Sequence, residues 1–242
     1  MCTVTFFPLA KKNNAWVLTS NRDEQKMRPT LSPEIYVHKD RELIYPKDQQ
    51  AGGTWIACSN KGTAACLLNG AFEAHVPQPP YRQSRGLVPI HALEATSFAS
   101  FCAQYLLEGI EPFTLIFIEK NDLYELRWNG EERFWRKLDA QQAYIWSSAT
   151  LYAAAVRQAR EQLFASFVAQ NATINPDLME CFHTFGKVGS ETNDLVMQRN
   201  SLQTLSISQI VFDENEMAFG YKDLIHQRKS CVSFDHVRTK MD

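Results

Sequence analysis

Tight turns recur between short apolar segments of this chain, and they limit the fold to sheets built from antiparallel hairpins. Asn60-Lys61-Gly62 separates the apolar residues 53–58 from residues 63–68. Asn129-Gly130 closes the last turn of a three-strand meander over residues 113–138. An Asn-Gly pair adopts the positive φ angles of a type I′ turn, which joins neighbouring antiparallel strands. Both segments are therefore expected to form hairpins.

Helix signals fall in two pairs between these strand groups. Residues 87–93 predict a first helix, and Ser97 is the expected N-cap of a second that ends near Gly109. Residues 151–169 contain neither Pro nor Gly and predict a third helix, and a fourth is expected to begin at Pro176. Strands, two helices, strands, two helices and strands in this order favour an α+β layered fold over a parallel doubly wound sheet. No linker interrupts the 242 residues, which indicates a single domain over residues 1–242.

The start of the chain carries a candidate nucleophile. Removal of Met1 would leave Cys2 as the first residue, with its α-amine available as a base for the thiol. Residues 3–9 and 15–18 predict a hairpin, which would bring Arg22 and Asp23 close to Cys2. An Asp accepts hydrogen bonds from an amine or thiol, and an Arg favours the thiolate. Two other interpretations stay open: a buried, unreactive Cys2 and a solvated charge cluster.

Four motifs together resemble the NRDE family, also called the transport and Golgi organisation protein 2 family. They are the opening Met1-Cys2, Asn21-Arg22-Asp23-Glu24, Gly52-Gly53-Thr54-Trp55 and Ser84-Arg85-Gly86. The resemblance implies an α+β fold of the N-terminal-nucleophile-hydrolase type. This is a four-layer αββα sandwich, similar to the cholylglycine hydrolase and penicillin V acylase group.

The resemblance also implies a site. Cys2 would be the nucleophile, Asp23 its contact at the amine, and Asn69 an oxyanion donor. Arg22 would replace the Arg that the group carries three residues before the Asp, where this chain has Ser20. The expected substrate-binding residues are Trp55, Arg85, Ser148 and Arg199. Ser148 stands where the group has a second oxyanion Asn, and Arg199 corresponds to a late Arg.

Two functions follow from the resemblance. The chain is either an amidohydrolase that cleaves non-peptide C–N bonds with Cys2, or a non-catalytic protein that handles haem, acyl-CoA or another lipid. The partner in both cases is a small amphipathic molecule: an acyl-amide, an acyl-CoA or haem. No cofactor is required, although haem is a candidate ligand. Because a Ser hydroxyl is shorter than an Asn amide, Ser148 predicts weak amidase activity.

The composition argues against several other classes of protein. The net charge of −2 gives no general attraction to nucleic acid, and no apolar run approaches the roughly 18 residues of a membrane span. The six histidines show no paired spacing that predicts a metal site. The six cysteines are scattered without an export signal, which indicates reduced thiols and a cytoplasmic protein. The sequence does not determine the oligomeric state.

Overall fold

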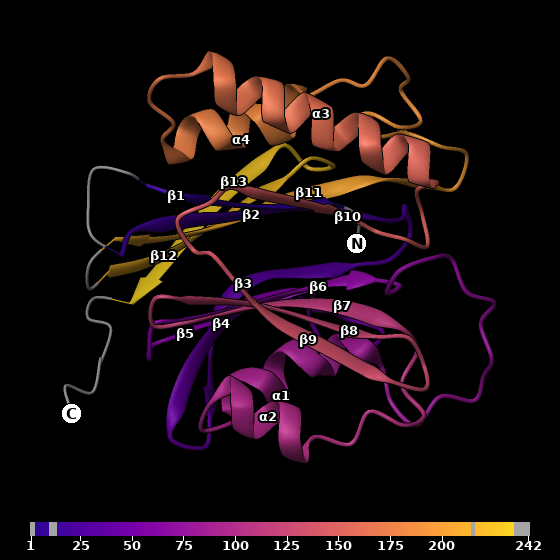
Figure 1. Cartoon of the computed structure of the whole chain (residues 1–242), viewed down its shortest axis with the longest axis vertical. Helices are drawn as coiled ribbons and strands as arrows, with labels where there is room; N and C mark the ends of the chain where they lie inside the picture. The colour runs from indigo at the N-terminus through magenta and orange to yellow at the C-terminus, as the bar shows by residue number, and fades with distance from the viewer. Residues whose placement is uncertain (1–2, 10–13, 214–215, 235–242) are drawn as a thin grey trace.

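Two antiparallel sheets lie face to face, and a pair of helices covers the outer face of each (Figure 1). The computed structural model describes residues 3–9, 14–213 and 216–234. In this part of the chain the layers run α3 and α4, first sheet, second sheet, α1 and α2. The expected four-layer α+β sandwich is confirmed.

The first sheet contains the beginning and the end of the described chain. Its strands, in spatial order, are β10 (Tyr144–Ser147), β1 (Thr3–Pro8), β2 (Trp16–Gln25), β11 (Leu202–Asp213), β12 (Glu216–Asp223) and β13 (Arg228–Phe234). The first hairpin is confirmed, because β1 pairs with β2 in a register that sets Thr3 opposite Asn21. On its other side β1 pairs with β10, where Thr3 lies opposite Ser147. Strand β2 is thus central, between β1 and β11.

The second sheet follows chain order throughout. Its strands are β3 (Thr30–His38), β4 (Arg41–Asp48), β5 (Ile56–Ser59), β6 (Thr63–Asn69), β7 (Phe113–Glu119), β8 (Asp122–Trp128) and β9 (Arg133–Leu138). Both predicted turns close hairpins, β5–β6 and β8–β9. The β8–β9 connection is not the expected type I′ turn, because it contains the four residues 129–132 and Gly130 has a positive φ of 108° whereas Asn129 does not. Strands β3 and β4 were not predicted, because Pro33 and several charged residues hide the pattern. Pro33 is tolerated because it lies at a register shift in an edge strand.

Three of the four predicted helices begin within one residue of the expected start, whereas α3 begins at Ala154, three residues later than expected, because Ala153, its N-cap, is still non-helical. The helical elements are the short 3-10 turn η1 (Arg85–Leu87), α1 (Val88–Glu94), α2 (Phe98–Gln104), α3 (Ala154–Gln170) and α4 (Pro176–Phe185). Ser97 caps α2 by accepting a hydrogen bond from the Ser100 N–H. Helix α2 ends at Gln104, earlier than expected, because Tyr105 is already extended and Gly109 belongs to a separate turn with φ of 74°.

Three apolar cores separate the four layers. The middle core lies between the sheets and includes Phe6, Trp16 and Trp55. The other two lie between the second sheet and α1–α2, and between the first sheet and α3–α4. Among the described residues, no helix is both long and apolar enough to cross a membrane.

Candidate functional site

The Asn21-Arg22-Asp23-Glu24 tetrad divides its side chains between the two faces of strand β2. Successive side chains of a strand point to opposite faces. Asn21 and Asp23 therefore point toward the α3–α4 layer, whereas Arg22 and Glu24 point toward the second sheet. Asn21, Arg22 and Asp23 are almost fully buried. The tetrad thus supplies two separate polar clusters.

The cluster between the sheets is an ion-pair network centred on Asp48 at the end of β4. Asp48 Oδ2 lies 2.7 Å from Arg22 Nη2 and 2.7 Å from Arg28 Nε. Its other oxygen accepts hydrogen bonds from the N–H groups of Gln50 and Ala51. Burial alone would raise the pKa of Asp48, but the Ala51 N–H and the two guanidinium charges outweigh it and lower that pKa.

The guanidinium of Arg22 has further partners besides Asp48. Its guanidinium lies 4.7 Å from the centre of the Trp55 ring, a cation–π contact, and donates to Thr30 Oγ1. Only 2% of its side chain is exposed. Burial lowers the pKa of Arg22, and the charge of Asp48 opposes that effect. Arg22 therefore builds the wall of the site, and its Asp48 partner was not predicted from the sequence.

This wall belongs to an open cleft between the two sheets. The residues lining it are Arg22, Glu24, Arg28, Asp48, Ala51, Gly53, Thr54, Trp55, Leu67, Asn69, Ser84, Arg85 and Gly86. Three of the sequence motifs line this cleft, and two of them, residues 52–55 and 84–86, touch through their backbones. A Cβ on Gly53 would lie 2.4 Å from the backbone of Gly86, and the Thr54 N–H donates to the Gly86 carbonyl over 2.8 Å. The missing side chain of Gly53 is what lets these backbones touch.

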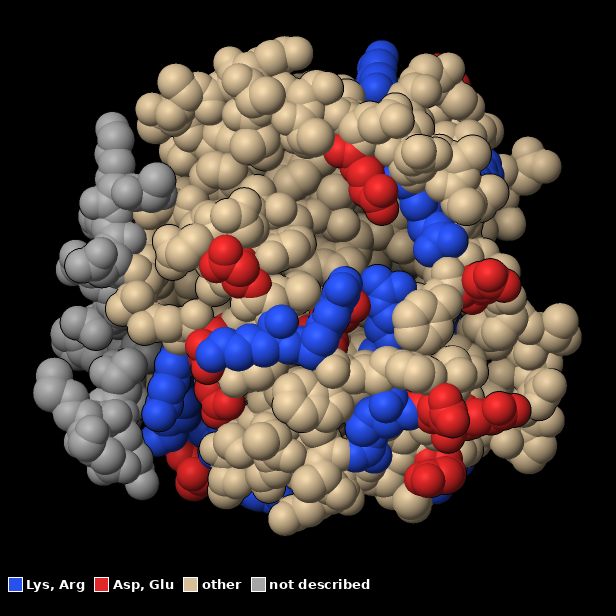
Figure 2. Space-filling view, viewed as in Figure 1, with Lys and Arg blue, Asp and Glu red and all other residues tan. Residues whose placement is uncertain are grey.

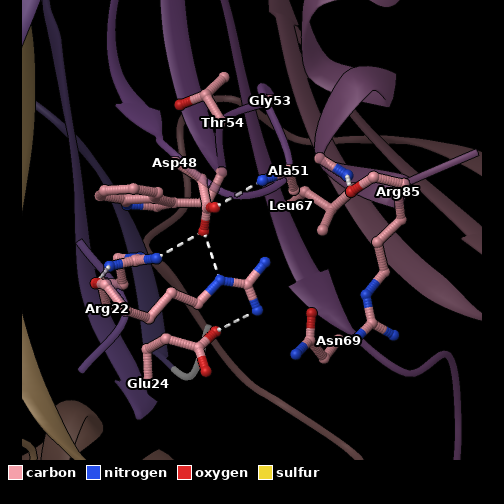
Figure 3. A pocket seen from close by; sticks show the side chains of 13 residues that line it. Arg22, Glu24, Asp48, Ala51, Gly53, Thr54, Leu67, Asn69 and Arg85 are labelled. Atoms are coloured by element: carbon pink, nitrogen blue, oxygen red, sulfur yellow. Dashed lines mark hydrogen bonds and ion pairs between the residues drawn. The ribbon is translucent and has the colours of Figure 1, made fainter. Parts of the chain in front are cut away.

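Asn69 and Arg85 offer the uncommitted polar groups of the cleft, and their side chains lie side by side in Figure 3. Arg85 uses Nη1 for Glu111, at 3.1 Å, and for the Pro112 carbonyl. Its Nε and Nη2, and the whole Asn69 amide, make no hydrogen bond within the described residues. Basic and acidic side chains gather across the middle of this face of the molecule, between the upper and lower layers (Figure 2). Burial lowers the pKa of Arg85, against the opposing charge of Glu111.

Asp23 belongs to a different cluster, under the helical layer. It accepts hydrogen bonds from Tyr152 Oη at 2.8 Å and Thr204 Oγ1 at 2.5 Å. Two guanidinium groups contact the Tyr152 ring, Arg160 at 3.7 Å and Arg199 at 5.1 Å from its centre. Arg199 therefore supports Asp23 through Tyr152 and does not line the cleft. Neither Tyr152 nor Arg160 has a sequence motif that would have identified it.

Asn21 anchors the same strand to α4 through a buried histidine. Its Nδ2 donates to the carbonyls of His183 and Leu195 at 3.1 and 2.6 Å, so its Oδ1 is the acceptor for His183 Nδ1. His183 Nε2 then accepts from Thr5 Oγ1, at 2.7 Å. Burial lowers the pKa of His183 to about 3, with a further contribution from Arg160. The imidazole is neutral and structural.

Ser148 is fully buried, and its hydroxyl donates to the main-chain carbonyl of Asn69 over 2.8 Å. A hydroxyl has one proton to donate, so in this arrangement Ser148 offers none to a ligand. Cys2 lies outside the described residues. The expected convergence of Asp23 and Asn69 on Cys2 therefore stays a prediction. Within the described part, Asn69 lines the cleft and Asp23 does not.

No group of three or more His, Cys, Asp or Glu side chains within the described ranges is arranged to hold a metal ion. Two solved structures that resemble this fold carry the names of an amidase and a hydrolase. A Caenorhabditis elegans N-acylethanolamine-hydrolyzing acid amidase ortholog matches with a TM-score of 0.59 at 12% identity, over 86% of this chain and 92% of that one. A variant of the Clostridium perfringens conjugated bile acid hydrolase matches with a TM-score of 0.55 at 8% identity, over 97% of this chain and 93% of that one.

These likenesses establish the class of fold: a sandwich of the N-terminal-nucleophile-hydrolase type. The family follows from the sequence. The model of the Transport and Golgi organisation 2 family matches residues 1–221, and the chain belongs to that family. A search of curated proteins found no match. The expected family resemblance is thus confirmed.

Proposed function

We propose that this chain binds an acyl amide carrying one anionic group in the cleft between the two sheets. One observation carries the proposal. The Asn69 amide and the Nε and Nη2 groups of Arg85 lie side by side in the cleft, and none of them has a hydrogen-bond partner within the described residues. An amide N–H suits an acyl carbonyl, and a guanidinium suits a carboxylate. Trp55 and Leu67 give the same cleft apolar walls.

The charge balance favours one anionic group over the several phosphates of an acyl-CoA. Arg22 and Arg28 share Asp48, Arg28 also pairs with Glu24, and Arg85 pairs with Glu111. Three guanidinium groups thus face three carboxylates, and the cluster has no net formal charge. The described lining also contains no His, Cys, Met or Tyr, so a haem there would take no axial ligand from these residues.

Calorimetric titration with N-octanoylglycine and with octanamide tests the proposal, because only the first ligand carries a carboxylate. Arg85→Gln should weaken N-octanoylglycine about tenfold or more, the value of a charge-assisted hydrogen bond, and leave octanamide unaffected. Asn69→Ala should weaken both ligands. Arg136→Ala is the matched control, because Arg136 is an ion-paired arginine on β9, 64% exposed and outside the cleft lining. Unchanged N-octanoylglycine affinity in Arg85→Gln would refute the proposal.

Cleavage of the bound C–N bond by Cys2 is the second candidate function. It is supported by the free Asn69 amide, a suitable oxyanion donor, and by structural neighbours that are an amidase and a hydrolase by name. Because the Ser148 proton is committed to the Asn69 carbonyl, one donor is lost, which costs about a hundredfold to a thousandfold in turnover. We therefore expect glycine release from N-octanoylglycine near background in both the natural protein and Cys2→Ala.

The state of the terminus decides how that assay is interpreted. Intact-mass measurement would show whether Met1 is removed, and alkylation would show whether one cysteine reacts far faster than the rest. A free, hyper-reactive Cys2 with robust turnover that disappears in Cys2→Ala would place hydrolysis first. Retained Met1 and ordinary thiols would exclude it.

A further inference from the structure

Glu111, two residues before β7, divides its two carboxylate oxygens between Arg85 and a histidine. Its Oε2 lies 3.1 Å from Arg85 Nη1, and its Oε1 lies 3.1 Å from His75 Nε2. Because a carboxylate oxygen only accepts, His75 Nε2 is the donor in this hydrogen bond. Neither Glu111 nor His75 lines the cleft, so both residues reach a ligand there through Arg85.

The backbone on both sides of Glu111 is fixed by hydrogen bonds to other elements. The Ile110 carbonyl accepts one from Trp128 Nε1 over 2.8 Å, and both of these residues are 2% exposed. The Pro112 carbonyl accepts one from the Gly70 N–H over 3.0 Å. The Glu111 side chain therefore starts from a fixed point of the fold.

Glu111 and its neighbour Pro112 determine which edge of the Arg85 guanidinium is left for a ligand. Arg85 Nη1 donates to Glu111 Oε2 at 3.1 Å and to the Pro112 carbonyl at 3.2 Å. Nε and Nη2 have no hydrogen-bond partner within the described residues. Their N–H groups point in parallel from one edge of the planar guanidinium, the arrangement that binds both oxygens of a carboxylate.

His75 leaves Glu111 with one oxygen for Arg85. A carboxylate whose oxygens are both free can take two N–H groups of one guanidinium. Glu111 would then occupy a second nitrogen of Arg85 and compete with a ligand for it. The hydrogen bond to His75 commits Oε1 elsewhere. The other ring nitrogen, Nδ1, is buried without a hydrogen-bond partner in the described chain, so Glu111 is the contact that orients this imidazole.

We propose that Glu111 and His75 are positioning residues of the cleft. Together they hold Arg85 by Nη1 and leave its Nε–Nη2 edge to a carboxylate of the ligand, bound through two parallel hydrogen bonds. This inference rests on the proposed function, which places the anionic group of the ligand at Arg85. It adds the identity of that group, because two donors on one edge match the two coplanar oxygens of a carboxylate.

Two substitutions of Glu111 with equal charge test the positioning role. Glu111→Gln keeps an acceptor for Arg85 Nη1, whereas Glu111→Ala keeps none, and both remove the negative charge. Calorimetric titration should therefore give a Kd for N-octanoylglycine about tenfold higher in Glu111→Ala than in Glu111→Gln, the value of one hydrogen bond to a charged group. Octanamide should bind both variants equally, because it carries no carboxylate.

A second pair tests the role of His75 with the Glu111 charge in place. His75→Gln keeps an N–H donor for Glu111 Oε1, and His75→Ala does not, so His75→Ala should bind N-octanoylglycine more weakly by a similar factor. His226→Ala is the matched control and should keep the natural affinity. His226 also contacts a carboxylate, Asp223 Oδ2 at 2.8 Å, but it is 67% exposed and outside the cleft lining.

Equal N-octanoylglycine affinity within each pair would overturn the positioning role, while a loss in Arg85→Gln would leave the proposed function standing. An equal loss for octanamide in Glu111→Ala would show a general structural role and overturn the inference as well. If Arg85→Gln binds N-octanoylglycine as tightly as the natural protein does, the proposed function fails, and the positioning role with it.

Discussion

Removal of the Asp48 carboxylate should lower the free energy of unfolding more than removal of a solvent-exposed ion pair would. Asp48→Ala leaves Arg22, 2% exposed, without its charge partner at 2.7 Å, and leaves Arg28 with Glu24 as its remaining partner. Breaking a buried pair in this way typically costs about 3–5 kcal/mol, because the remaining charge stays desolvated. In a chain of this size that corresponds to a fall of about 6–20 °C in Tm.

The assay is thermal unfolding followed by circular dichroism at pH 7, with two comparison variants. Asp48→Asn keeps an acceptor for Arg22 and should lose less than Asp48→Ala. Asp122→Ala removes the 2.8 Å pair with Lys137, whose partners are 39% and 57% exposed, and should cost no more than about 1 kcal/mol. If Asp48→Ala is no less stable than Asp122→Ala, the ion-pair cluster does not hold the wall of the cleft.

Three further outcomes are expected. Because the folded pKa of His183 is about 3 and its ordinary value is 6.5, the unfolded state takes the proton first, so stability falls as pH drops below about 6.5. His183→Gln should remove about 1.4 kcal/mol per pH unit of that slope in urea titrations. Gly53→Ala should cost about 1–3 kcal/mol in the same titrations, whereas Gly220→Ala, whose Cβ has no neighbour closer than 3.8 Å, should be nearly neutral. Ser148→Ala should weaken N-octanoylglycine binding measured by calorimetry, and that loss should vanish when Asn69 is already Ala.

Arg22 and Asp23 lie on opposite faces of β2, and only part of this arrangement follows from the sequence. Arg22 and Asp23 are adjacent on a strand, so the twofold periodicity of side chains already implied opposite faces. That signal was available in the sequence. The sequence did not show which face of β2 borders a cleft. That depends on the packing of the layers, because the second sheet covers one face and α3–α4 cover the other.

Local chemistry in the sequence determined the hairpins, three of the four helix starts and the family. The Asn129-Gly130 turn and the Ser97 cap act within a few residues, so neighbours in the sequence suffice to predict them. The tertiary structure alone decided the partners in the site. Asp48 meets Arg22 and Tyr152 meets Asp23 across 26 and 129 residues of chain, and such contacts exist only once the layers have packed. Packing also made Ser148 a donor to the main-chain carbonyl of Asn69. A buried hydroxyl has no access to water and therefore hydrogen-bonds to a nearby protein acceptor.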